Sequence, residues 1–347
     1  MSRTWAAAIA ALAVLAVGVG VGVAVGSGSG TGSTRSVVYV TGTTTSAPVV
    51  WLAPAAGGRG RRLGPGSQPL LAPDGSLVVA SEASGLVLYP ASGGPSRRFF
   101  ATAVATAVAV AFSPDSRYIA VVLASTDPAS SAYSGLAVID TTTFASRVIV
   151  HGQIYGASFA PDGSDRIAYG TAPSARLTAR VDVGIIQADG SGARRITSDG
   201  RSLNPVWGRD GIAFDRERLR TDAEPAYQVW LMASDGSGRR ALTALAIPRL
   251  REGLVPTAFS DNGRVLLADY EGQDTSQAWV VRLPTGRATP LPAGLVPAAV
   301  SRDGARVLVD RGGFLNSPDR GVVESLPLDG GRPRVLAVRG AEPSWND

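Results

Sequence analysis

The chain has 347 residues, no cysteine, one histidine (His151) and a formal net charge of +5, and all 33 of its basic residues are arginines. The absence of cysteine and lysine excludes disulfides, thiol nucleophiles, cysteine-ligated metals, Schiff-base chemistry and a P-loop. A single histidine excludes a histidine-rich metal site within one chain, and the small, scattered positive charge gives no case for nucleic-acid binding. The 45% share of hydrophobic residues is enough to build a folded core.

The first 26 residues have the pattern of a membrane segment. Arg3 precedes an uncharged, mostly apolar run that includes 21 residues from Trp5 to Val25, and about 20 apolar residues span a bilayer. A cleavable signal peptide has a shorter apolar region, although the small residues Ala24 and Gly26 leave cleavage open as the alternative. We therefore expect a signal anchor or transmembrane helix (or a signal peptide) over 1–26, a Gly/Ser tether over 27–35, and a folded domain over 36–347 on the extracytoplasmic side of the cytoplasmic membrane, or secreted.

One phrase recurs through the folded part: an apolar run, a small residue, an Asp-Gly-like turn and a second apolar run. It reads LLAPDGSLVVA from Leu70 and AFSDNGRVLLADY from Ala258. Successive turns are 41 to 52 residues apart, and strand-like runs at this period predict the four-stranded blades of a β-propeller. Aspartate accepts main-chain N–H groups and glycine takes a positive φ, so we expect the repeated acids to cap turns rather than to bind calcium or catalyse. The turn residues are Asp74, Asp115, Asp162, Asp210, Asn262 and Asp303.

The two ends of the folded part complete each other. The C-terminal GAEPSWND matches the start of a first strand, whereas the segment from Ser36 supplies second, third and fourth strands without a first. Joining them in one blade leaves no free edge strand. Six internal units plus this composite unit predict an all-β, seven-bladed β-propeller at about 45 residues per blade, with a six-bladed ring as the alternative.

The phrases FSPDSRYIAVV, NPVWGRDGIAF, VWLMASDGSGRRALT and EPSW resemble the repeats of TolB-like (WD40-like, PD40) propellers, and the resemblance covers essentially all of residues 36–347. It implies a propeller fold and an envelope scaffold or an accessory domain of a peptidase. TolB itself has a separate domain before a six-bladed propeller, and this chain has only the apolar segment and tether there. Its Pal-like binding is therefore not carried over.

Catalysis finds little support in the sequence. No G-x-S-x-G nucleophile elbow occurs, and the chain has no room for a hydrolase domain beside the propeller. His151 is the only candidate base, and it lies in a predicted loop between strands. We expect no catalytic residues, no cofactor and no metal site.

The long, individual connections between second and third strands point to a binding face, because binding residues concentrate on loops that a rigid scaffold positions. Arginines in these loops form a candidate basic patch opposite loop carboxylates, and aromatic residues are candidate anchors of the kind found at protein interfaces. The candidates are Tyr133, Arg216, Arg218, Arg220, Asp222, Glu224, Tyr227, Arg249, Arg251, Tyr270, Glu271, Asp274 and Phe314.

The sequence favours a membrane-tethered, non-catalytic, protein-binding scaffold of the cell envelope, whose partner is another envelope protein or a cell-wall component. The alternatives are a propeller enzyme, such as a lactonase, a glycosidase or a quinoprotein-like dehydrogenase, and an extracytoplasmic sensor domain. Such enzymes place polar ligands at the central channel, where the first strands of this chain offer mostly apolar or neutral residues. These are Gln68, Val108, Tyr155, Asn204, Pro256 and Pro297.

Overall fold

The computed structural model describes residues 35–42, 47–127, 132–172, 180–218, 226–248, 251–272, 276–312 and 320–346, with the side chain of Arg218 excepted. The expected membrane segment (1–26) and most of the expected tether (27–34) lie outside these residues. Within the described part of the chain, no helix is both long and apolar enough to cross a bilayer.

The described residues build an all-β protein whose strands pair antiparallel in consecutive sets of four. Five sets form separate four-stranded sheets. Their strands are β28 (Ala341–Trp345), β1 (Ser36–Thr41), β2 (Val49–Pro54) and β3 (Arg61–Pro65); β4 (Ser67–Leu71), β5 (Leu77–Glu82), β6 (Gly85–Pro90) and β7 (Arg97–Phe99); β8 (Ala105–Phe112), β9 (Tyr118–Ser125), β10 (Gly135–Asp140) and β11 (Ser146–His151); β12 (Gln153–Phe159), β13 (Arg166–Ala172), β14 (Asp182–Gln187) and β15 (Arg194–Arg195); β24 (Leu295–Val300), β25 (Arg306–Arg311), β26 (Val322–Pro327) and β27 (Arg334–Val338).

Two further sets are linked in one larger sheet. A single parallel bridge between Tyr227 and Gly253 joins a third strand to the first strand of the next set. The strands are β16 (Ser202–Gly208), β17 (Gly211–Arg218), β18 (Ala226–Met232) and β19 (Arg240–Ala241), followed by β20 (Arg251–Phe259), β21 (Val265–Gly272), β22 (Ala278–Arg282) and β23 (Arg287–Pro290).

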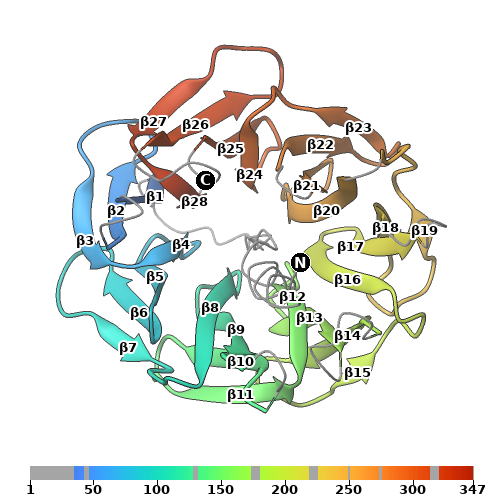
Figure 1. Ribbon diagram of the computed structural model, residues 1–347, viewed down its shortest axis with the longest axis horizontal. Helices are drawn as coiled ribbons and strands as arrows, with labels where there is room; N and C mark the ends of the chain where they lie inside the picture. The colour runs from blue at the N-terminus through green and yellow to red at the C-terminus, as the bar shows by residue number, and fades with distance from the viewer. Residues whose placement is uncertain are drawn as a thin grey trace, which may run out of the picture.

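The sets stand around a common centre as the blades of a β-propeller. Figure 1 shows the first strand of each set near the centre and the fourth strand at the rim. The innermost strands contact one another in order around the ring, including β24 with β28 and β28 with β4. The apolar core lies between neighbouring sets, where Val, Ile, Leu and Ala from facing sheets pack together. Because inner strands are covered on both faces, their sequences are continuously apolar rather than alternating.

The two ends of the folded part meet in one sheet, as the sequence predicts. β28 pairs with β1 in the registers Val37↔Trp345 and Val38↔Ser344. Ser36 donates its main-chain N–H to the Asn346 side-chain oxygen at 2.7 Å, and Trp345 is 3% exposed. The C-terminal strand therefore seals the ring.

The repeated turn acids cap turns, as predicted. In the turns that follow the first strands, the Asp or Asn side chain accepts the main-chain N–H two residues further on, at 2.9 to 3.0 Å. The following residue takes a positive φ; it is glycine in four of these turns, with +74° at Gly75 and +69° at Gly263, and Ser116 in the fifth, with +64°. Asp210 differs, because its hairpin is tighter and pairs Gly208 directly with Gly211.

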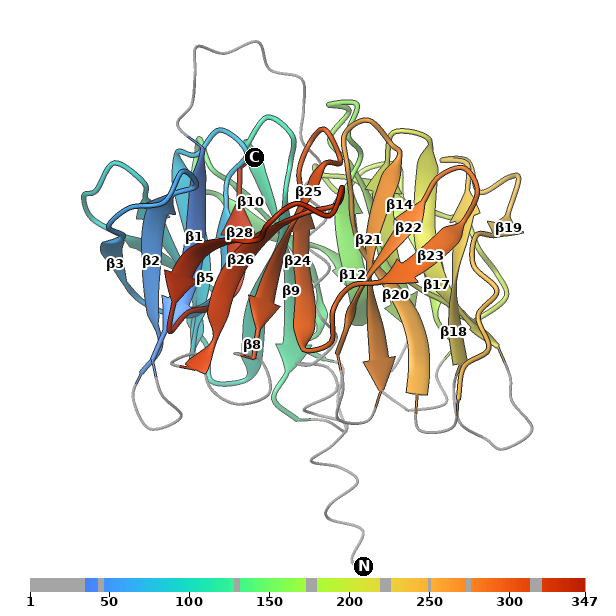
Figure 2. The same cartoon turned by 90° about the horizontal axis from the view of Figure 1, so that it is seen from above.

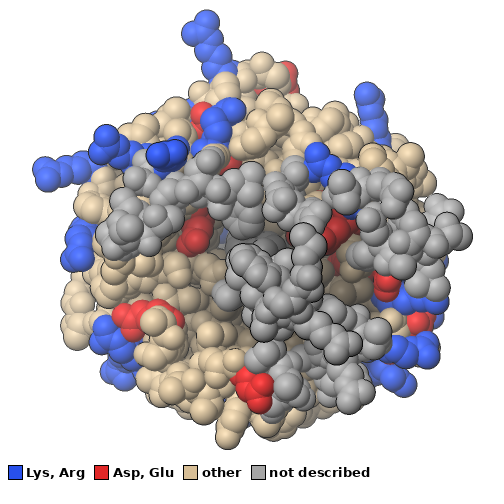
Figure 3. Space-filling view, viewed as in Figure 1, with Lys and Arg blue, Asp and Glu red and all other residues tan. Residues whose placement is uncertain are grey.

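The ring has two unlike faces. Figure 2 shows second strands such as β21 ending at one face and third strands such as β18 beginning there. We call this end the long-loop face; it faces the viewer in Figures 1 and 3. The opposite end carries the first-to-second and third-to-fourth turns, and we call it the short-turn face.

Candidate binding face

The structure describes six of the predicted binding residues fully. Four of them, Tyr227, Arg251, Tyr270 and Glu271, lie on β18, β20 and β21 around the bridge between the two joined sets. Arg216 lies on the adjoining β17, and Tyr133 lies beyond β9 in a set that does not neighbour this junction. The backbone of Arg218 ends β17. The other predicted residues lie outside the described part of the chain: Arg220, Asp222, Glu224, Arg249, Asp274 and Phe314.

Close main-chain approach creates the junction. Gly253 has a φ of +115°, and a Cβ atom built on it would collide with the carbonyl oxygen of Tyr227. Only glycine therefore lets β20 approach β18 closely enough to form the parallel bridge. This contact places Tyr227 of one set beside Arg251 and Glu252 of the next.

Tyr227 stands among acidic side chains. Burial raises the pKa of its phenol well above the usual value, and the negative charges of neighbouring carboxylates raise it further. Those carboxylates belong to Asp215 and Glu217 on β17, to Glu252 on β20 and to Glu271 on β21. Tyr227 is therefore a neutral hydrogen-bonding group at the centre of an acidic region of the long-loop face.

A cation and two aromatic rings stack beside this acidic region. The guanidinium carbon of Arg251 lies 5.9 Å from the ring centre of Tyr270, and the Tyr270 ring stacks on Trp279 of β22 at 5.3 Å and 28°. Such stacks hold a long arginine side chain in one place while its charge stays available. Two predicted residues, Arg251 and Tyr270, thus meet, while Trp279 was not among the predictions.

Arg216 has a partner that the sequence did not indicate. Its Nε donates to Asp199 at 2.8 Å, and its guanidinium carbon lies 4.6 Å from the Trp230 ring centre. Burial favours a raised pKa for Asp199, but hydrogen bonds from Arg216, Ser202 and Arg201 outweigh it and lower the pKa. Asp199 lies in the connection before β16, far from Arg216 in sequence, so no local pattern links the two.

Tyr133 is isolated from this cluster. It is 55% exposed, the most exposed of the described aromatic residues. The β12–β15 set stands between its own set and the junction. Tyr133 therefore belongs to the long-loop face but to a separate part of it.

Three neighbouring sets carry a buried aspartate at the same place on their second strands. Their cross-strand pairs are Leu203↔Asp215, Val255↔Asp269 and Val296↔Asp310, and all three aspartates are at most 5% exposed. Sequence reasoning missed them, although each follows an apolar run at the end of a second strand and so carries a recognisable signal. The sequence phrases are AFDR, LADY and LVDR.

Two of these aspartates hold other segments of the chain. Ser276 donates its hydroxyl to Asp269 at 2.7 to 2.8 Å, and the N–H of Gln277 donates at 3.0 Å. Burial nevertheless raises the pKa of Asp269 to about 6. Asp310 accepts the N–H of Glu342 at 3.4 Å. Both carboxylates thus have a structural task.

Asp215 is different. It is 1% exposed, its Oδ1 atom has no hydrogen-bond partner, and burial raises its pKa to about 7, although a hydrogen bond from Asn204 opposes the shift. Asn204 has a φ of +41°, which a bulge in β16 imposes. Asp215 is therefore a buried carboxyl that changes protonation near neutral pH beside Tyr227.

Besides Glu252 on β20, the inner strands hold a second carboxylate that the sequence analysis did not assign to the channel. Glu342 accepts the N–H of Gln68 at 2.5 Å, and burial raises its pKa. Gln68, Asn204 and Glu342 each have a positive φ and precede a proline, so they occupy the same bulge in different sets. Among the described residues, no group of three or more acids or histidines has the arrangement of a metal site.

The long-loop face is charged unevenly. Figure 3 shows most of the visible arginines projecting from the rim of the ring, while the visible acidic side chains lie both near the rim and further in.

No protein family profile matches the chain, and no curated protein sequence matches it. Solved structures do. TolB from Acinetobacter baumannii is 15% identical, with a TM-score of 0.52 over 90% of this chain and 82% of that chain. The β-propeller domain of the Trilobed protease from Pyrococcus furiosus is 11% identical, with a TM-score of 0.63 over 88% of this chain and 93% of that chain.

An oligogalacturonate lyase from Vibrio parahaemolyticus is also similar, with 15% identity and a TM-score of 0.55 over 88% of this chain and 85% of that chain. At these identities the likeness shows the fold alone. The chain has a TolB-like β-propeller fold, a fold found in TolB proteins and in enzymes alike.

Proposed function

We propose that this chain is a non-catalytic, protein-binding scaffold of the cell envelope, and that its long-loop face around the β18–β20 junction recognises the partner. The junction combines features that protein interfaces favour: aromatic rings, arginines held in place, and a partly buried tyrosine. The partner is another envelope protein, with a cell-wall glycan as the alternative.

The observation that carries this proposal is the pair of arginines stacked on aromatic rings. Arg216 lies over Trp230 and Arg251 lies over Tyr270, on strands that flank the same junction. Stacking lowers the conformational entropy that an arginine loses when a partner binds, so both side chains are pre-organised for contact.

The proposal includes a ring of seven blades. Seven four-strand sets among the described residues support this count, including the set completed by β28. It also includes a membrane tether formed by residues 1–35. The apolar run from Trp5 to Val25 supports a single span with the propeller outside the cytoplasmic membrane.

A propeller enzyme is the second candidate, and Asp215 favours it. A buried carboxyl with a pKa of about 7 beside a tyrosine has the properties of a general acid or base. Against this, Asp269 and Asp310, which occupy the same place in the next sets, bind parts of the chain instead. An extracytoplasmic sensor domain would use the same long-loop face and differs only in the partner.

The test is crosslinked capture from intact membranes. Residues 219–225 are replaced by a Gly-Ser segment of equal length, and a second variant carries Arg251→Ala. We expect both changes to lower the amount of the same captured protein at least about tenfold, because each change removes part of one interface. The matched control Arg287→Ala alters an exposed arginine on the rim strand β23 and should leave capture unchanged.

Two outcomes contradict the scaffold. Capture that is equal in all three variants would exclude the junction as the recognition element. Turnover of oligosaccharide or lactone substrates by the purified chain, abolished by Asp215→Asn, would establish the enzyme instead.

A further inference from the structure

The short-turn face repeats one contact around the ring. An arginine occupies the same register on the fourth strand of most sets, paired with the same position of the third strand. The equivalent residue on β23 is Ala288, which pairs with Val281. The arginines in this register are Arg61, Arg97, Arg147, Arg194, Arg240 and Arg334.

Most of these arginines contact the next set. Arg194 donates to the main-chain carbonyls of Ser234 and Asp235 at 3.4 and 3.5 Å, and Arg147 donates to the Ala188 carbonyl at 3.0 Å. Each acceptor lies in the third-to-fourth turn of the following set. The other three arginines contact the equivalent turn of their own following set. Arg61 donates to the carbonyl of Ala91, Arg97 lies over the ring of Phe144 at 4.0 Å, and Arg334 lies beside Gly57.

Arg240 is the exception among the described arginines of this register. It has no such contact, because the turn that should receive it is shorter. Eight residues separate Leu231 from its partner Arg240, and the other arginine-bearing hairpins have the same length. Only six separate Val281 from Ala288. The β22–β23 turn therefore stops short of Arg240.

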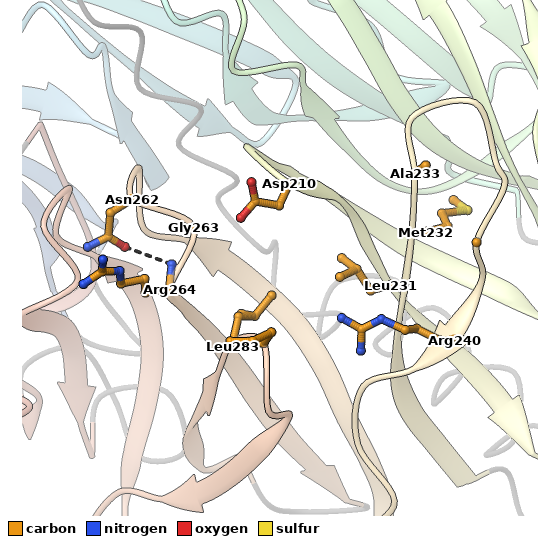
Figure 4. Close-up of a pocket in the computed structure, with 11 residues that line it drawn as sticks. Asp210, Leu231, Met232, Ala233, Arg240, Asn262, Gly263, Arg264 and Leu283 are labelled. Carbon is orange, nitrogen blue, oxygen red and sulfur yellow. Dashed lines mark hydrogen bonds between the residues drawn. The ribbon is translucent and has the colours of Figure 1, made fainter.

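A cleft of about 470 Å³ opens at this place. Figure 4 shows Leu231 and Arg240 on one side and Leu283 and Arg264 on the other. Asp210 also lines it, so the charged lining has two cations and one anion. The volume is that of a small-ligand or peptide site.

We propose that this cleft binds the carboxyl end of a polypeptide whose last residue is apolar. Three of the other arginines of the register, Arg61, Arg147 and Arg194, bind main-chain carbonyl oxygens, so the same chemistry at Arg240 selects a main-chain oxygen from outside the ring. A terminal carboxylate satisfies the excess positive charge and matches the two-pronged guanidinium. The apolar side chain then packs on Leu231 and Leu283. This site is on the short-turn face and is independent of the function proposed for the long-loop face.

The chain offers a spectroscopic reporter for the test. Its methionines are Met1 and Met232, and Met232 lines the cleft. The full chain, labelled with ¹³C at the methionine methyl groups and kept in detergent micelles, is titrated with acetyl-Ala-Ala-Leu. Met232→Leu assigns the signal. We expect a saturable shift of the Met232 signal, and binding at least about tenfold weaker for the same peptide as a carboxamide.

Three variants locate the contact. Arg240→Ala should weaken binding at least about tenfold and Arg240→Lys by less, because lysine keeps the charge but lacks the planar guanidinium that donates two parallel hydrogen bonds. Arg147→Ala is the matched control, because Arg147 has the same register but contacts a turn that does not line the cleft, and it should bind as the unaltered chain does. Inserting Gly-Ser after Pro284 restores the eight-residue turn and should abolish binding. Equal affinity for the carboxamide, unchanged binding by Arg240→Ala, or no saturable shift would overturn the proposal.

Discussion

Tyr227 and Gly253 form the one parallel bridge between named strands of the described chain, and it joins two sets that would otherwise be separate sheets. The bridge requires the main chain of Gly253 to lie against the carbonyl of Tyr227, where a Cβ atom has no room. The acidic region, the stacked arginines and the partly buried tyrosine of the long-loop face are all arranged around this contact.

Replacing Gly253 by alanine should therefore destabilise the protein. The change adds a main-chain collision to a φ of +115° that alanine resists, and we expect a loss of about 2–4 kcal/mol in the free energy of unfolding. Urea unfolding followed by tryptophan fluorescence measures it. Gly294→Ala is the matched control, because Gly294 has a φ of +77° but no atom within 4 Å of the added Cβ. Equal losses for both variants would mean that strain, not the close approach, decides the effect.

The sealing strand makes a second prediction. Trp345 is 3% exposed and packs in the core between β28, β1 and the β24–β27 set. Trp345→Ala leaves a cavity and weakens ring closure, so we expect a loss of about 3–5 kcal/mol. Thermal unfolding measures it. Val338→Ala, at a side chain that is 68% exposed, should change the melting temperature little. A melting temperature for Trp345→Ala within about 1 °C of the unaltered chain would show that closure does not contribute to stability.

The ion pair between Arg216 and Asp199 is open to a double-mutant cycle. The pair is partly exposed, with side-chain exposures of 31% and 22%, so we expect a coupling of only about 0.5–1 kcal/mol. Arg216→Lys should lose most of it, because a lysine cannot donate to Asp199 while lying over Trp230 in the same way. A coupling near zero would mean that Trp230 alone positions Arg216.

The sequence predicted the repeat, the capped turns and the union of the two ends because each depends on residues close together in the chain or on a repeated phrase. Asp74 and Gly75 fix their own turn, and the missing first strand was visible as a missing phrase. The bridge at Gly253 was not predictable in this way, because in a glycine-rich chain the sequence does not indicate which glycine makes a close main-chain contact.

The candidate site was predicted in part. Loop position identified Arg251 and Tyr270, but not that Tyr270 stacks on Trp279 or that Arg216 pairs with Asp199. Both contacts depend on how the strands pack. Asp215 was missed for a different reason. The repeat predicts where a second strand ends. It does not predict that the Asp215 carboxyl is buried with an unpaired oxygen, because that depends on how the neighbouring sheet packs against it.

Asp215 makes stability depend on pH. Burial raises the folded-state pKa of this carboxyl to about 7, whereas an unfolded aspartate has a pKa of about 3.9. Between these values the folded state holds a proton that the unfolded state has released, so the free energy of unfolding falls as pH rises from about 4 to 7 and then levels off. Asp269 and Asp261, whose pKa values are raised to about 6 by burial, act in the same direction.

Asp215→Asn should remove the contribution of Asp215 to this fall. An amide resembles the protonated carboxyl in shape and cannot ionise, so the variant should be close in stability to the unaltered chain at pH 4 and more stable at pH 8 by roughly 1–4 kcal/mol. Urea unfolding at a series of pH values measures the difference. Asp189→Asn is the control, since hydrogen bonds from Ser191 lower the pKa of that exposed carboxyl and place its effect below pH 4. An Asp215→Asn stability curve parallel to that of the unaltered chain between pH 4 and 8 would show that Asp215 is already ionised in the folded protein. Asp215 would then not be a proton donor, and it would no longer favour the enzyme alternative.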